Sequence, residues 1–288
     1  MNRKKSIDEF EALFEQASIP VLDIPALAIN PISIVLEDES LDPSIVSVAQ
    51  YLMNRFGLSI QVHATDARAG FALELGQTMG FEWKGMPYGQ SETLAEQVDR
   101  ASSRMVMLGR TGGDSVISLD SFVESVHVPI LILNRPIRKP DTLFGHILHS
   151  LTGRFEQERD FSISFHLAER AADVTVIHTV SSDQIDDVRQ TLRVSSQVSA
   201  EEQEEVLGHL TVHGERYLKA VVHAARELPC HVTYRIEVGT ALEVIEQQLS
   251  EGDYSLLVVG AHREGRSHIE AEVYQLMHRV TASAVLAL

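Results

Sequence analysis

Cysteine is nearly absent from this chain of 288 residues, because Cys230 is the only one. A single cysteine excludes an intrachain disulfide and is typical of proteins from a reducing compartment. We expect Cys230 to be a small core residue that opens a strand. The sequence also lacks a run of about 18 uncharged apolar residues, and no apolar stretch of a signal peptide follows the basic N-terminus. The sequence therefore predicts a soluble cytoplasmic protein.

Aromatic residues and positive charge are scarce as well. Phe, Trp and Tyr make up 6% of the residues, so the core must be built from Val, Ile, Leu and Ala, as in buried parallel strands covered by helices. There are 24 Lys and Arg against 41 Asp and Glu, which gives a formal net charge of −17. This balance argues against nucleic acid or an anionic membrane surface as a partner. It leaves room for a small anion, because backbone N–H groups can hold a phosphate inside an acidic protein.

Apolar runs of strand length alternate with helical patterns in the first half of the chain. We expect five strands, at Ile32–Leu36, Leu58–Val62, Phe81–Trp83, Met105–Leu108 and Ile130–Leu133. Two of the intervening helices are expected to end near Gly57 and Gly80. Strands that alternate with helices predict a parallel sheet with helical crossovers.

The same order of elements returns after a segment that is rich in proline and charge. We expect strands at His146–Leu151, Val174–Ile177, His231–Ile236, Leu256–Val259 and Ala284–Leu288, and a helix over Glu156–Ala172. The predicted organisation is an N-terminal helix and extension at 1–30, a first domain at 31–134, a linker at 135–143 and a second domain at 144–288. The fold class is α/β, with two tandem Rossmann-like domains.

Two of these strands are followed by loops that contain glycine. The segment Leu256–Gly265 and its counterpart Met105–Gly113 resemble the fourth strand and following loop of universal stress proteins. In that family the loop begins the pattern G-x2-G-x9-G-[S/T]. Its glycines let the backbone approach the triphosphate of an adenine nucleotide, and its hydroxyl adds a contact. The family also has an Asp at the end of the first strand, so the chain resembles a tandem universal stress protein.

The resemblance implies an arrangement for both halves. Each is expected to be a five-stranded, mostly parallel sheet in the order 3-2-1-4-5, with helices on both faces. In this family the fifth strands of two domains pair antiparallel. Here Val128–Leu133 and Ala284–Leu288 are apolar and would leave exposed edges if unpaired, so we expect them to pair within the chain as an internal pseudo-dimer. A further homodimer is left open.

Both nucleotide motifs depart from the family pattern. In the first half Gly109 and Gly112 keep G-x2-G, but no Gly-Ser or Gly-Thr pair follows, and Glu37 stands at the position of the family's Asp. In the second half Arg263 replaces the second glycine and Thr152 stands at the Asp position. Each change removes steric room or a charge-assisted contact. We therefore interpret both sites as degraded, the second more than the first.

Each remaining signal has a structural alternative. The glycine cluster is either a tight turn or a phosphate cradle, and the acids after the first strand are either a solvated loop or ligands of a ribose or magnesium ion. The cationic loop of the second half either grips an anion or is surface charge. The candidate nucleotide- or anion-binding residues are Glu37, Asp38, Gly109, Gly112, Gly113, Ser115, Gly260, His262, Arg263, Gly265 and Ser267.

The sequence offers little for metal binding or catalysis. His209 and His213 have the i, i+4 spacing of zinc ligands, but no third ligand is identifiable. We find no Ser-His-Asp or Cys-His constellation on one face. We therefore predict no metal and no enzyme activity.

Three functions are compared on this basis. The first is a non-enzymatic stress-response protein that binds ATP or AMP, or another small anion, weakly in its first domain. The second is an interaction or regulatory module for an enzyme or transporter that needs no nucleotide. The third, an ATP-hydrolysing enzyme, is the least supported because the Gly-Ser pairs and a catalytic base are missing. A protein partner is expected in the first two, with the polar stretch at 183–202 as a docking region.

Overall fold

The computed structural model describes residues 22–110, 116–152, 158–180, 214–260, 263–264, 268–269 and 271–287. The predicted N-terminal helix and the polar stretch at 183–202 lie outside these residues. None of the helices in the described part combines the length and the apolar character needed to cross a lipid bilayer.

Both halves contain the predicted alternation of strands and helices. The first half contains β1 (Ile32–Leu36), α2 (Asp42–Phe56), β2 (Ile60–Ala64), α3 (Ala69–Met79), β3 (Glu82–Trp83), α4 (Ser91–Arg100), β4 (Met105–Gly109), α5 (Leu119–Ser125) and β5 (Ile130–Leu133). The second half contains β6 (His146–Thr152), α6 (Glu158–Leu167), β7 (Asp173–Val180), a helix over 214–224, β8 (His231–Val238), α9 (Ala241–Glu251), β9 (Leu256–Gly260), α10 (Ala271–Arg279) and β12 (Ser283–Ala287). Two short strands, β10 (Arg263–Glu264) and β11 (His268–Ile269), pair separately.

Local sequence signals set several helix ends. Proline at the start of α2 is favourable because the first N–H groups of a helix need no intrahelical partner. Gly57 then ends α2 with a left-handed φ of 67°, and Gly80 ends α3 with a φ of 71°. Both ends confirm the prediction. The helix predicted to reach Ala172 ends earlier, at Leu167, and Ala171 has a left-handed φ of 64°. There the Ala171 N–H donates to the carbonyl of Pro229 at 2.7 Å instead of continuing the helix.

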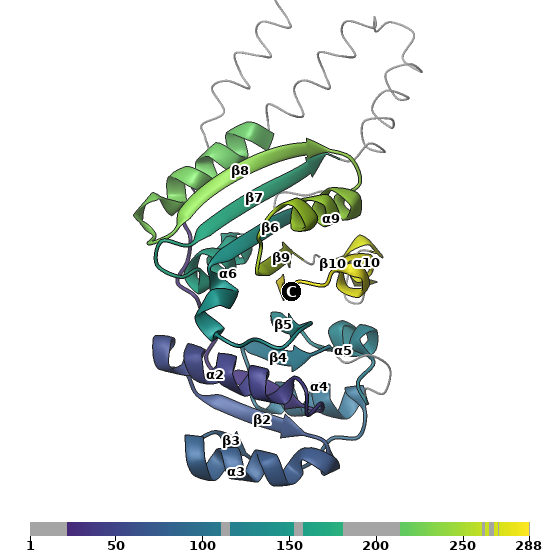
Figure 1. Cartoon of the computed structure of the whole chain (residues 1–288). Coiled ribbons are helices and arrows are strands. Elements are labelled where there is room, and N and C mark those ends of the chain that lie inside the picture. Colours follow the sequence, from purple (N-terminus) through teal and green to yellow (C-terminus); the bar gives the residue numbers. More distant parts are fainter. Residues whose placement is uncertain are drawn as a thin grey trace, which may run out of the picture.

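The strands form one continuous ten-stranded sheet in the order β3-β2-β1-β4-β5-β12-β9-β6-β7-β8 (Figure 1). The order is 3-2-1-4-5 from the outer edge of the first half and the same order reversed in the second. All neighbouring strands are parallel except the fifth strands of the two halves, β5 and β12, which pair antiparallel at the centre. The predicted strand order and the predicted pairing of the last strands are therefore confirmed.

Helices cover both faces of the sheet, and each face has its own apolar core. On one face the core includes side chains of α2, α3, α6 and the helix over 214–224. On the other face it includes side chains of α4, α5, α9 and α10. Both cores continue through the central strands, since Val285 of β12 belongs to the first core and Leu286 to the second. Cys230 is a buried member of the first core, as predicted, and burial raises the pKa of its thiol.

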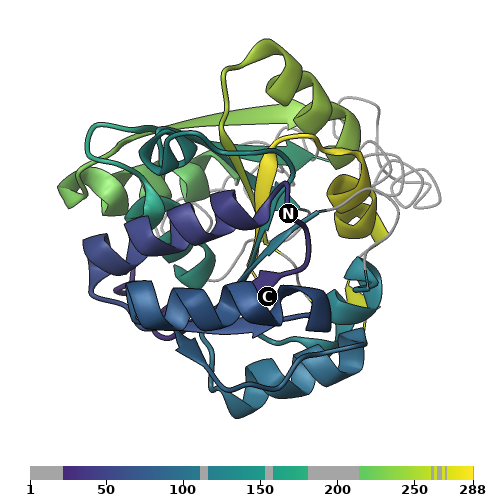
Figure 2. The same ribbon diagram turned by 60° about the horizontal axis from the view of Figure 1, so that its bottom comes forward.

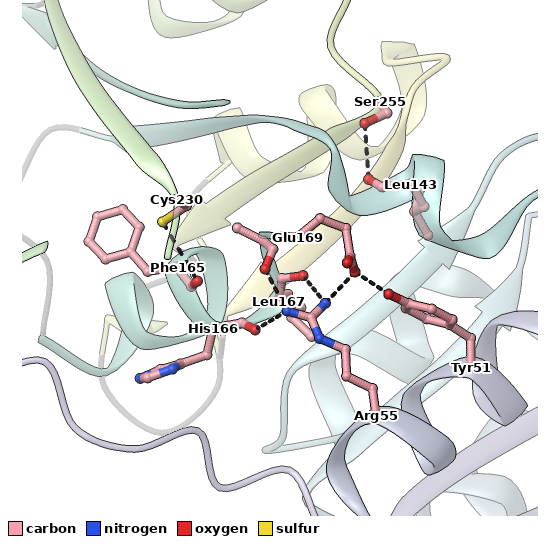
Figure 3. A network of polar contacts seen from close by, with 10 residues as sticks. Tyr51, Arg55, Leu143, Phe165, His166, Leu167, Glu169, Cys230 and Ser255 are labelled. Carbon is pink, nitrogen blue, oxygen red and sulfur yellow. Dashed lines mark hydrogen bonds and ion pairs between the residues drawn. The ribbon is translucent and has the colours of Figure 1, made fainter. Parts of the chain in front are cut away.

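An arginine of the first half caps a helix of the second half. Arg55, in the last turn of α2, donates to the carbonyls of His166, Leu167 and Ala168 at 3.2, 2.8 and 2.5 Å (Figure 3). Cationic side chains are favourable at a helix C-terminus, where carbonyl groups lack intrahelical partners. Arg55 also pairs with Glu169 at 2.5 Å. In Figure 2 the α2 helix, drawn in indigo, lies between the blue α3 helix and the teal and green segments of the second half.

The carboxylate of Glu169 also binds Tyr51, which lies one turn before Arg55 on α2 (Figure 3). The Tyr51 hydroxyl donates to this carboxylate, and burial together with the Glu169 charge raises the pKa of Tyr51 to about 12. The hydroxyl therefore keeps its proton, and its role as donor, at neutral pH. Two neighbouring turns of α2 are thus tied to the end of α6.

A second arginine makes the same kind of contact on the other face of the sheet. Arg110 directly follows β4 and donates to the carbonyls of Met277, at 2.6 Å, and His278. These carbonyls lie in the last turn of α10. Asn134, directly after β5, adds hydrogen bonds to the carbonyls of Val280 and Ala282 at 3.1 and 2.7 Å. The halves are therefore joined by strand pairing and by first-half side chains that cap second-half helices.

Candidate functional site

The first-half candidate residues meet at the carboxyl ends of two neighbouring strands. Glu37 and Asp38 follow β1, and Gly109 is the last residue of β4, which pairs with β1. The three residues line one small hollow. This is the position where open α/β sheets bind ligands. Gly112, Gly113 and Ser115 lie outside the described residues.

The acids of this region bind groups of their own chain. The Glu37 carboxylate accepts hydrogen bonds from the backbone N–H groups of Val116 and of Ile117, the latter at 3.2 Å. The Asp38 carboxylate accepts from the N–H of Ser40 at 2.7 Å. Glu37 therefore fixes the segment that leads into α5, and Asp38 closes its own turn.

A third acid, which the sequence analysis did not single out, is the most buried of this group. Asp42 opens α2 and is fully buried. It accepts from the N–H groups of Glu37 and Asp38 at 3.0 and 3.2 Å, and from Arg68 Nε at 2.6 Å. Burial raises the pKa of Asp42, against the lowering effect of Arg68 and the two N–H groups. The Asp42-Pro43 pair at the start of a helical pattern was the available signal.

Gly109 is in close contact with α2. A Cβ atom at this position would lie 2.9 Å from both Cβ and Cδ1 of Leu41, a distance at which something must shift. Leu41 is itself buried at the start of the helix. The hollow lined by Glu37, Leu41 and Gly109 has no room for a water molecule. The structure thus gives Gly109 a packing role, since it lets α2 approach the end of β4.

We expect the change Gly109→Ala to lower the free energy of unfolding by about 1 to 3 kcal/mol through overpacking against Leu41. Urea denaturation measures this loss. The control is Gly89→Ala, where a Cβ would meet nothing within 4 Å and we expect a change within about 0.5 kcal/mol. In a Leu41→Gly background, which removes both of the contacting atoms, the cost of Gly109→Ala should nearly vanish. An equal cost in both backgrounds would contradict the packing role.

Only two of the five second-half candidate residues, Gly260 and Arg263, lie in the described part of the chain. Gly260 is the last residue of β9, which lies beside β6 as β4 lies beside β1. Arg263 begins β10. His262, Gly265 and Ser267 lie outside the described residues, as do His209 and His213. Within the described part, no three His, Cys, Asp or Glu side chains gather as ligands of a metal ion.

A larger pocket lies elsewhere in the first half, between β2, β3 and α4. Its volume is about 240 Å³ and its wall is mostly apolar. The lining residues are Gln61, Val62, His63, Glu82, Trp83, Lys84, Met86, Gln97, Arg100 and Ala101. Sequence reasoning missed this pocket because three separate elements form it. The polar alternation of Gln61 and His63 along β2 was the available signal.

A chain of buried hydrogen bonds supports the pocket by linking two of its lining residues, His63 and Gln97, to Ser33 of β1. Ser103 Oγ lies 2.5 Å from Ser33 Oγ, which lies 2.8 Å from Nε2 of His63, and His63 Nδ1 lies 3.2 Å from Oε1 of Gln97. The amide oxygen of Gln97 can only accept, so we assign the proton to Nδ1. Nε2 then accepts from Ser33, and Ser33 accepts from Ser103. With a neutral imidazole, every side chain in this series of hydrogen bonds has a matching donor or acceptor.

Burial lowers the pKa of His63 below its ordinary value of 6.5. The unfolded chain therefore binds a proton at a higher pH than the folded chain, and stability falls as the pH drops below 6.5. We expect His63→Asn to remove this part of the decline, which urea midpoints at about pH 7.5 and about pH 5.5 would measure. The exposed His127→Asn variant should keep the full decline. An unchanged decline in His63→Asn would show that His63 is not its source.

The comparisons with known proteins concern the fold. No family model matches the sequence, and no curated protein matches it. Among solved structures, a protein of unknown function from Pseudomonas aeruginosa PAO1 is 16% identical with a TM-score of 0.58, and the match covers 91% of this chain and 93% of that one. A universal stress protein from Archaeoglobus fulgidus DSM 4304 is 15% identical with a TM-score of 0.54, and the match covers 89% and 95%. Likeness at this identity shows the fold, and it extends over both halves.

Proposed function

We propose that this chain, which has the universal-stress-protein fold in two tandem copies, is a non-catalytic regulatory module that acts by binding and needs no adenine nucleotide in its first half. The observation that carries the proposal is the contact between Leu41 and Gly109. At the strand end where the sequence resemblance places a phosphate-cradling loop, Leu41, the residue before α2, leaves no room even for a Cβ atom on the glycine.

Electrostatics support the same proposal. Glu37, Asp38 and Asp42 bring three carboxyl groups to this hollow, and the chain carries a formal net charge of −17. Arg68, which lies beside them, pairs with Asp42 at 2.6 Å and with Glu39 at 3.0 Å. A triphosphate would therefore meet like charge at this edge, next to a cation that already has two carboxylate partners.

The test is nucleotide binding by the full chain. We expect gently purified protein to carry no nucleotide by mass spectrometry, and its melting temperature to stay unchanged with millimolar ATP or AMP, with and without magnesium. A rise in melting temperature, or copurified ATP, would contradict the proposal in favour of the nucleotide-binding stress protein. Phosphate release that Gly112→Glu abolishes would instead favour an ATP-hydrolysing enzyme.

A further inference from the structure

We propose that the pocket between β2, β3 and α4 binds an uncharged aromatic molecule of one or two rings that carries an N–H or O–H donor. The pocket lies over the outer strands of the first half, since its lining runs along β2 from Gln61 to His63 and past β3 to Met86. It shares no lining residue with the hollow at the carboxyl ends of β1 and β4. The proposal therefore concerns a different place from the proposed function and does not depend on it.

The size of the pocket limits the ligand. Its volume is about 240 Å³, whereas pockets for drug-sized ligands measure roughly 300–1,000 Å³ and an engineered cavity of about 150 Å³ accepts benzene. The wall is mostly apolar, so burial of apolar ligand surface supplies the driving force. A molecule of one or two rings fits these limits.

The side chains at the rim favour an aromatic ligand over an aliphatic one. Met86 is 52% exposed, and its thioether is of the kind that makes favourable contacts with aromatic rings. Lys84 and Arg100 also line the pocket, and cationic side chains are attracted to the face of a ring. An aliphatic molecule of the same size would gain neither contact.

Gln61 supplies the acceptor that selects a ligand with a donor. Its Nε2 donates to the carbonyl of Ala101 at 3.3 Å, which fixes the orientation of the amide because a carbonyl can only accept. Its Oε1 is buried and has no hydrogen-bond partner among the described residues. A buried acceptor without a donor is unfavourable. This oxygen is closed off from solvent in the free protein, so a ligand N–H or O–H reaches it when the Gln61 side chain rotates toward the pocket, and the ligand then supplies the hydrogen bond that the free protein lacks.

The charges around the pocket are balanced, which is why the ligand is expected to be neutral. Lys84 pairs with Glu82 at 3.5 Å and Arg100 pairs with Glu96 at 2.9 Å. His63 is neutral in the hydrogen-bonded chain that supports the pocket. An ionic ligand would have to compete with these partners, whereas a neutral one leaves them in place.

Calorimetric titration of the full chain with indole and with N-methylindole tests the proposal. The two probes have nearly the same shape, but only indole can donate to Gln61. We expect saturable one-to-one binding of indole, and binding of N-methylindole weaker by roughly tenfold. The variant Gln61→Met should lower the affinity for indole to that for N-methylindole. The matched exchange Gln77→Met, on the exposed side of α3, should leave both affinities unchanged.

A second variant keeps the test decisive if Gln61→Met does not fold. Ala101→Leu fills the pocket and should abolish the binding of both probes, with folding checked by circular dichroism. Absence of saturable indole binding to the unmodified chain overturns the proposal. So do equal affinities for the two probes, or full indole binding by a folded Ala101→Leu variant. Because these probes carry no phosphate, none of these three outcomes bears on nucleotide binding at the carboxyl edge.

Discussion

Replacing Arg55 with alanine is expected to lower the free energy of unfolding by about 3 kcal/mol. The guanidinium group donates to three carbonyls at the end of α6 and pairs with Glu169. The contact is largely shielded from water, since the two side chains are 22% and 28% exposed. The variant loses the charge-assisted hydrogen bonds and leaves Glu169 with Tyr51 but without its cation. The urea concentration at the unfolding midpoint measures the loss.

Two control variants separate this contact from a general effect of removing arginine. Arg100→Ala removes an exposed arginine that pairs with Glu96 one helical turn away, and we expect a change within about 0.5 kcal/mol. Arg55→Lys keeps the charge but not the planar, multiply donating group, so an intermediate loss is expected. An Arg55→Ala variant that unfolds at the wild-type urea concentration would show that the capping of α6 contributes nothing to stability.

The second large effect is expected at Asp42. The change Asp42→Ala leaves Arg68, which is 15% exposed, without its buried partner and leaves two backbone N–H groups without an acceptor. Removal of one partner from a buried pair costs about 3 to 5 kcal/mol. We expect a loss in this range from urea denaturation, together with weaker order at the start of α2.

Asp42→Asn dissects the contribution of the charge. An asparagine keeps an oxygen that accepts from the two N–H groups, so the variant should lose less stability than Asp42→Ala. The control is Asp66→Ala, which removes an exposed acid two positions before Arg68 and should change stability by less than about 0.5 kcal/mol. If Asp42→Ala and Asp66→Ala behave alike, the buried contact between Asp42 and Arg68 does not stabilise the fold.

Much of the architecture was predictable because its signals are local or follow from one physical constraint. The glycines that end α2 and α3 occupy left-handed positions, a conformation that glycine adopts without steric cost. The pairing of β5 with β12 was expected from the family resemblance, and the two apolar edges that it covers supply the physical reason. Periodicity alone did not determine the strand order, which came from the family resemblance.

The features that the sequence did not reveal depend on contacts between distant segments. The packing of Leu41 on Gly109 joins residues 68 positions apart, and no local pattern distinguishes such a glycine from one in a ligand-binding loop. The capping of α6 by Arg55 joins residues more than 110 positions apart. The same contact lies at the end of α6, where the helix predicted to reach Ala172 stops at Leu167.

The two arginine caps have an evolutionary consequence for the second half. The contacts require the side chains of Arg55 and Arg110 in the first half, but the groups that they bind in α6 and α10 are main-chain carbonyls, which every amino acid possesses. The side chains in those last helical turns can therefore drift without loss of the docking acceptors, as long as each helix ends at the same place. The contacts between the two halves therefore constrain the side chains of the first half, which donate, more than those of the second.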